Sequence, residues 1–125
     1  MNRSIITAAA AALFLAASAS AWTAETRYVA TYLEVKSAAI NAGAALTRQY
    51  VRATRAEAGN VGISAFQEIG RSHRFVVIET WTDPAALAEH EKAPHTVEFR
   101  QKLKSFHRSP YDPVSYTHLT LPTKA

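Results

Sequence analysis

Alternating apolar and polar positions predict three strands in this chain, over residues 27–35, 61–69 and 74–81. Between the first two, apolar residues recur at three- and four-residue spacing. This repeat predicts a helix over residues 37–58, with Ser37 as its N-cap. The side chains of the first predicted strand alternate between two faces, and one of these faces is expected to pack against the helix.

The last part of the pattern predicts two helical pieces separated by a proline. Asp83 is a suitable N-cap, and Pro84 stands at the first helical position. Pro94 interrupts the helix, because proline disfavours the helical conformation at the residue before it; a second piece is expected over residues 95–105. The resulting α+β order is one strand short of a split βαββαβ unit, so we expect the last strand to be missing or replaced. Helices on one side would leave an apolar sheet face for a second subunit.

The two ends of the chain do not follow this pattern. Residues 1–21 combine a basic start, an apolar run and the small residues Ala19-Ser20-Ala21, which together are typical of a secretory signal peptide. The alternative, an alanine-rich amphipathic helix, lacks a polar face. The apolar run is short for a membrane span. We therefore expect a periplasmic or secreted protein whose mature domain spans residues 22–113, with no stable membrane anchor after cleavage.

Residues 114–125 differ from the rest for another reason. Val114 to Lys124 resemble the translation of a transposase adapter used in short-read library preparation. We expect this tail to be non-native, with the native sequence interrupted at about residue 113. The alternative is an ordinary threonine-rich strand followed by a proline-terminated tail.

Composition narrows the possible chemistry. The chain has 125 residues and no cysteine, which suits one domain and excludes disulfides, thiolate zinc sites and cysteine nucleophiles. Its net charge of +4 falls to +2 over residues 22–113, where twelve Lys and Arg stand against ten Asp and Glu. Because no basic stripe with interleaved aromatic residues remains, we expect no nucleic-acid partner.

Two residues of the third predicted strand are candidates for a site. Glu79 stands among apolar residues, and a buried carboxylate there needs a partner or becomes protonated. It is either a base or substrate-orienting group, or a structural carboxylate bonded to a helix N-terminus or an arginine. Trp81, at the end of the strand, either walls an aromatic pocket or fills the core.

His90 and His95 are the other candidates, five residues apart across Pro94, and both can turn toward the sheet. A histidine of near-neutral pKa can take a proton from a phenol or hydroquinone. The alternatives are a structural, half-buried His90 and a helix-capping His95. A metal site that adds Glu91 and Glu98 is the rival chemistry. The spacing does not match a helical zinc motif, so we expect neither a metal nor another cofactor.

The core resembles the antibiotic biosynthesis monooxygenase family of dimeric α/β barrels over about residues 28–103. The similarity lies in Glu57-Ala58-Gly59-Asn60, in Phe75 with Glu79-Thr80-Trp81, and in Ala86-Leu87-Ala88-Glu89-His90 followed by His95 and Phe99. It implies a ferredoxin-like subunit that pairs sheet-to-sheet as a homodimer. It also implies oxidation of a small aromatic or quinol substrate by O2 without a cofactor.

On this resemblance the expected site has two groups of residues. The catalytic group comprises His90, His95 and Glu79, and the substrate-binding group comprises Trp81, Tyr32, Phe75 and Asn60. Haem degradation is less expected, because family members with that activity carry an asparagine in the first strand, where this chain has Thr31-Tyr32. The alternative function is a non-catalytic, small-molecule-binding or stress-related module of the same fold.

Overall fold

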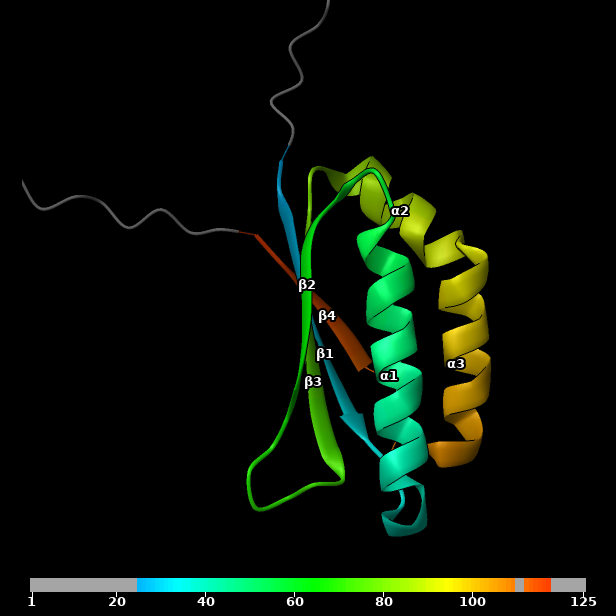
Figure 1. Ribbon diagram of the computed structural model, residues 1–125. Helices are drawn as coiled ribbons and strands as arrows, with labels where there is room; N and C mark the ends of the chain where they lie inside the picture. The colour runs from blue at the N-terminus through cyan, green and yellow to red at the C-terminus, as the bar shows by residue number, and fades with distance from the viewer. Residues whose placement is uncertain (1–24, 110–111, 118–125) are drawn as a thin grey trace, which may run out of the picture.

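In the computed structural model, which describes residues 25–109 and 112–117, helices cover one face of a four-stranded antiparallel sheet (Figure 1). In chain order the elements are β1 (Arg27–Glu34), a 3-10 turn (Ser37–Ala39), α1 (Ile40–Arg55), β2 (Asn60–Gln67), β3 (Arg74–Trp81), α2 (Pro84–Lys92), α3 (Pro94–Phe106) and β4 (Asp112–Tyr116). The strand order is β2-β3-β1-β4. The predicted ferredoxin-like α+β fold is confirmed.

Alternation along the two central strands decides which side chains face the helices. Leu33 on β1 lies opposite Phe75 on β3, and Thr31 lies opposite Val77; all four are buried. Leu33, Phe75 and Val77 belong to a buried hydrophobic cluster that joins the sheet to α1 and α3. Its members are Leu33, Val35, Leu46, Tyr50, Val51, Ile63, Phe75, Val77, Phe99 and Leu103.

The predicted start of the first helix is wrong, and the predicted start and end of the next helix are confirmed. Ser37 is not an N-cap: it begins the 3-10 turn, and α1 proper starts at Ile40 without a side-chain cap. Asp83 caps α2 as predicted, because its carboxylate accepts a hydrogen bond from the Ala86 amide at 2.7 Å. The break at Pro94 also forms as predicted.

The fourth strand forms where the pattern predicted a missing or replaced one. Val114 and Tyr116 of β4 lie opposite Ala30 and Tyr28 of β1. β4 therefore draws on the tail of residues 114–125, whose foreign origin stays a prediction. The signal peptide falls outside the described residues. Within the described residues, no helix has both the length and the apolar character needed to cross a membrane.

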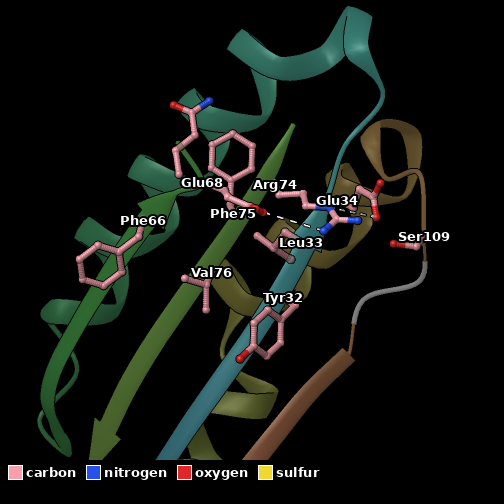
Figure 2. A pocket seen from close by; sticks show the side chains of 10 residues that line it. Tyr32, Leu33, Glu34, Phe66, Glu68, Arg74, Phe75, Val76 and Ser109 are labelled. Atoms are coloured by element: carbon pink, nitrogen blue, oxygen red, sulfur yellow. Dashed lines mark ion pairs between the residues drawn. The ribbon is translucent and has the colours of Figure 1, made fainter. Parts of the chain in front are cut away.

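The sheet face turned away from the helices carries exposed aromatic side chains and a hollow (Figure 2). Tyr32, Val76 and Phe66 lie side by side on β1, β3 and β2, and Tyr32 and Phe66 are 62% and 56% exposed. These three residues line the open-face hollow, of about 420 Å³, and Glu34 and Arg74 form an ion pair beside them. Contiguous apolar surface of this kind marks an interaction or ligand site.

Gly59, in the turn between α1 and β2, lies too close to α2 for any side chain. A Cβ at this position would stand 2.3 Å from the Cβ of Ala86. The Gly59 carbonyl also accepts a hydrogen bond from the Thr82 amide at 3.0 Å. Together these contacts hold the turn that carries Glu57 against the start of α2.

Gly59→Ala is expected to lower the free energy of unfolding by about 1–3 kcal/mol, because the added methyl group overpacks the contact with Ala86. Gly62→Ala is the matched control, since a Cβ there meets nothing within 4 Å. Its expected change is within about 0.5 kcal/mol. Urea denaturation followed by circular dichroism measures both, and equal stability of the two variants would contradict the prediction.

Candidate functional site

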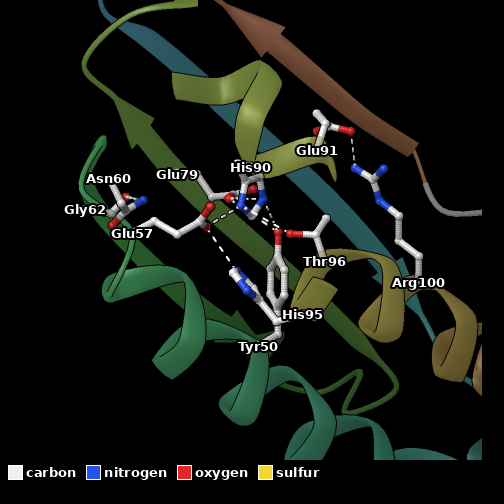
Figure 3. A network of polar contacts seen from close by, with 10 residues as sticks. All are labelled: Tyr50, Glu57, Asn60, Gly62, Glu79, His90, Glu91, His95, Thr96 and Arg100. Atoms are coloured by element: carbon white, nitrogen blue, oxygen red, sulfur yellow. Dashed lines mark hydrogen bonds and ion pairs between the residues drawn. The ribbon is translucent and has the colours of Figure 1, made fainter. Parts of the chain in front are cut away.

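His90 lies at the centre of a group of polar side chains between the helices and the sheet (Figure 3). It is 1% exposed; its Nδ1 lies 2.6 Å from Oε2 of Glu57, and its Nε2 lies 2.8 Å from the Tyr50 hydroxyl. Because an ionised carboxylate only accepts, the proton is on Nδ1, and Nε2 is left as an acceptor that shares the single Tyr50 hydroxyl proton with the Glu79 carboxylate. Burial lowers the pKa of His90, although the hydrogen bond to Glu57 opposes this, and burial thus favours the neutral ring.

Glu79 places a buried carboxylate behind His90. It projects from β3, is 2% exposed, and its Oε1 lies 3.3 Å from Nε2 of His90 and 3.4 Å from the Tyr50 hydroxyl. Burial raises the pKa of Glu79 to about 7, although the hydrogen bond from Tyr50 acts in the opposite direction. Near neutral pH this carboxyl group is therefore poised between its two protonation states.

Glu57 joins the two histidines. It follows the end of α1, and its Oε2 accepts hydrogen bonds from Nδ1 of His90 and from Nε2 of His95, the latter at 3.0 Å. The side chain of His95 is 26% exposed. We call these five residues, Tyr50, Glu57, Glu79, His90 and His95, the His90 cluster; it runs from the buried Glu79 to the surface at His95.

Local features of the sequence bring the cluster together. The chain leaves the helical conformation at Ala93, with ψ of 140°, before α3 starts at Pro94. This break turns the chain so that the rings of His90 and His95 lie 5.9 Å apart. Trp81 is fully buried, and its ring packs against His90 with the centres 4.4 Å apart.

A second, small hollow reaches the cluster from the surface between α1 and α3. We call it the His95 hollow; its volume is about 60 Å³, and His95, Tyr50 and Phe99 contribute to its lining. Ligand pockets of folded proteins are usually larger, about 300–1,000 Å³. Gln49 and Lys102 also line it and are exposed, so their movement would enlarge the opening.

The structure brings four of the seven predicted site residues together: Glu79, Trp81, His90 and His95. Tyr32 lines the open-face hollow, on the side of the sheet away from these four, and Phe75, which borders the same hollow, is buried in the core on the helix side. Asn60 lies opposite Trp81 in the sheet, but its side chain donates to the Gly62 carbonyl at an irregularity of β2. The roles assigned to these residues stay predictions.

Two residues of the cluster were missed by the sequence-based assignment. Tyr50 and Glu57 stand seven residues apart, which places them on one face of a continuing helix. That spacing was a usable signal for the pair. Nothing in the sequence, however, indicates that Glu57 meets His90 and His95, which lie 33 and 38 residues further along.

The cluster also contains a possible set of metal ligands. One atom each from Glu57, His90 and His95 lies within 4.8 Å of the other two. The acidic residues considered from the sequence are not part of this set. Glu91 pairs with Arg100, and Glu98 pairs with Lys102 (Figure 3 shows the first pair).

Comparison with known proteins gives one family and one fold. Residues 26–102 match the family described as antibiotic biosynthesis monooxygenase. A Bacillus subtilis (strain 168) protein named "Putative monooxygenase YcnE" is 31% identical over 83 residues, which cover 66% of this chain and 87% of that protein.

Solved structures share the fold. One, titled "Putative antibiotic biosynthesis monooxygenase from Nitrosomonas europaea", has a TM-score of 0.72 and 24% identity, covering 81% of this chain and 96% of its own. Rv0793 from Mycobacterium tuberculosis has a TM-score of 0.72 and 21% identity, covering 78% of this chain and 99% of its own. At these identities the likeness concerns the fold alone.

The raised pKa of Glu79 makes stability depend on pH, and Glu79→Gln is expected to remove that dependence. The ordinary pKa of 4.5 applies to the unfolded chain and a pKa of about 7 to the folded one. The unfolded state therefore loses this proton first, and stability falls as pH rises through that window. When the pH is raised from about 5 to about 8, the free energy of unfolding of the wild type should therefore fall by about 2 kcal/mol relative to that of Glu79→Gln.

Urea denaturation at the two pH values measures this difference. Glu89→Gln, on the exposed side of α2, is the matched control and should change far less between them. If Glu79→Gln and the wild type respond equally to pH, burial does not hold the Glu79 carboxyl group in its protonated form.

Proposed function

Because the chain belongs to the antibiotic biosynthesis monooxygenase family, we propose that it uses O2 to oxidise a small phenol or hydroquinone. The observation that carries this proposal is the His90 cluster, which reaches the surface at His95 beside the His95 hollow. Glu57 holds Nε2 of His95, so Nδ1 is left to accept a proton from a substrate hydroxyl. His90 and Glu79 stand behind this base as buried proton-accepting groups.

The proposed reaction needs only the substrate, O2 and a base. His95 takes the hydroxyl proton, and the electron-rich anion passes one electron to O2, giving an aryloxyl radical and superoxide. The two radicals combine by forming a bond between a ring carbon and oxygen. The peroxide anion formed in this way takes back the proton held by His95. The resulting hydroperoxide loses water and leaves a carbonyl group at that ring carbon, so one oxygen atom enters the product and the other leaves as water.

The site limits the size of the substrate. The His95 hollow, of about 60 Å³, admits part of one ring beside His95. The stacked rings of Tyr50 and Phe99, 4.2 Å apart, give it an aromatic wall. A single-ring phenol or hydroquinone therefore fits the site better than a fused polycyclic compound does.

The open-face hollow favours a second candidate function, a non-catalytic small-molecule-binding module. This hollow is of ligand size, about 420 Å³, but its lining contains none of the His90 cluster. A ligand bound there would be separated from His95 by the sheet. Binding without oxygen consumption would favour this second function.

Oxygen uptake in the presence of simple hydroquinones, without added metal or flavin, tests the proposed oxidation. The purified protein should consume O2 above the rate of the same mixture with heat-denatured protein. His95→Ala should lower the rate at least about a hundredfold, because it removes the proton acceptor.

His73→Ala is the matched control, because His73 has similar exposure and also pairs with a carboxylate, that of Glu34 at 3.5 Å. Its rate should equal that of the wild type. Absence of oxygen uptake by the wild type, or equal loss in both variants, would contradict the proposed role of His95.

We further propose that the protein is exported by residues 1–21 and works as a homodimer. The open face supports the dimer, because exposed apolar side chains there need a cover that the chain itself does not supply among its described residues. Ile78, in the middle of that face on β3, is 39% exposed. A second copy of this face would bury it.

Ile78→Asp is expected to shift the protein from dimer to monomer, because it places a charge at the centre of the buried face. Ile69→Asp is the matched control: Ile69 is fully exposed in the turn between β2 and β3 and should leave the dimer intact. Sedimentation velocity measures both. A wild-type protein that sediments as a monomer at all concentrations would contradict the proposed dimer.

A further inference from the structure

We propose that Glu57, His90 and His95 form a binding site for a divalent first-row transition metal ion such as Zn²⁺. The site goes beyond the proposed oxidation, which requires no metal, and it revises our expectation that the chain binds none. Two imidazoles and one carboxylate are a ligand set that zinc uses in proteins where a fourth position stays open.

The geometry of the three donors supports this site. Oε2 of Glu57 lies 2.6 Å from Nδ1 of His90 and 3.0 Å from Nε2 of His95, and all three atoms lie within 4.8 Å of one another. Around a tetrahedral ion with bonds of about 2.0–2.1 Å, donor atoms stand about 3.3 Å apart. The Glu57 carboxylate and the two histidine rings must therefore adjust toward this spacing to admit the ion between them.

The contact on the far side of His90 is an independent observation. Nε2 of His90 faces the Glu79 carboxylate at 3.3 Å and the Tyr50 hydroxyl at 2.8 Å. When a metal takes Nδ1, the ring proton moves to Nε2, where Glu79 accepts it. Histidines that bind metals usually donate their second nitrogen to a carboxylate in this way. In the proposed site, the buried Glu79 carboxyl group would accept the hydrogen bond that His90 donates from Nε2.

The surroundings also leave room for a fourth ligand. His95 lines the His95 hollow, whose volume of about 60 Å³ accommodates water. The hydroxyl of Thr96 lies 3.3 Å from Nδ1 of His90, within reach of a water bound to the ion. Glu57 and His95 are 20% and 26% exposed, so an ion can enter from the surface.

The ion would link three segments of the fold. Glu57 follows α1, His90 belongs to α2, and His95 lies in the first turn of α3. A ligand that binds only the folded state stabilises it, and a structural link of this kind raises the melting temperature. Stabilisation by the metal is therefore a readout that needs no enzymatic activity.

The experiment titrates the chelator-treated full chain with Zn²⁺ by isothermal calorimetry and with Co²⁺ by visible absorption spectroscopy. We expect one ion per chain, the visible bands of low-symmetry Co²⁺, and a melting temperature that rises by several degrees with Zn²⁺. Glu57→Gln keeps the shape of the side chain but loses its charge, and should weaken binding at least about a hundredfold, as should His95→Ala. Glu79→Gln, which alters only the partner of His90, should weaken it about tenfold.

His73→Ala is the matched control, since His73 and Glu34 form a histidine–carboxylate pair without a second histidine. It should leave affinity and stoichiometry unchanged. Absence of one-to-one binding by the wild type, or wild-type affinity in Glu57→Gln and His95→Ala, overturns the proposed site. Circular dichroism confirms that each variant is folded.

Because these measurements use no substrate, their outcome does not depend on the proposed oxidation. The two proposals meet at His95, whose lone pair either accepts a proton or binds the ion. If hydroquinones are oxidised by the metal-free protein, filling the site with Zn²⁺ is expected to lower that rate.

Discussion

A single oxygen of Glu57 accepts hydrogen bonds from two histidines, and the arrangement of the helices around the site depends on this shared contact. This contact joins the turn after α1 to α2 and α3, which lie far from that turn along the chain. With Nδ1 of His90 directed at Glu57, Nε2 faces Tyr50 and Glu79. A buried polar group left without a partner costs about 1–3 kcal/mol, so these side chains stabilise one another only as a set.

Local patterns predicted most of the fold, and they named three of the five residues that the structure brings together in the His90 cluster. Alternation located the three predicted strands, and Asp83 and Pro94 marked the helix start and the break that set His90 beside His95. The misplaced N-cap at Ser37 shows the limit of such signals, because a serine in the right position made no capping bond.

The parts of the fold and of the site that local patterns did not predict depend on contacts between residues far apart in the chain. Glu57 meets His90 from the turn after α1, which packs against α2 through the contact of Gly59 with Ala86. Side-chain spacing cannot show this. Tyr32 illustrates the same limit: its strand and face were predictable, but only the three-dimensional arrangement shows that the sheet separates it from His90.

The close approach of Gly59 and Ala86 has an evolutionary consequence. With 2.3 Å between the alanine Cβ and the place where a second would stand, a side chain at position 59 is accommodated without strain only when position 86 is glycine. A lineage that gains a side chain at one of them must accept glycine at the other or move the helix. Such a move would displace the turn that presents Glu57. These two small residues should therefore covary in relatives that retain the Glu57 carboxylate, even though neither of them takes part in its chemistry.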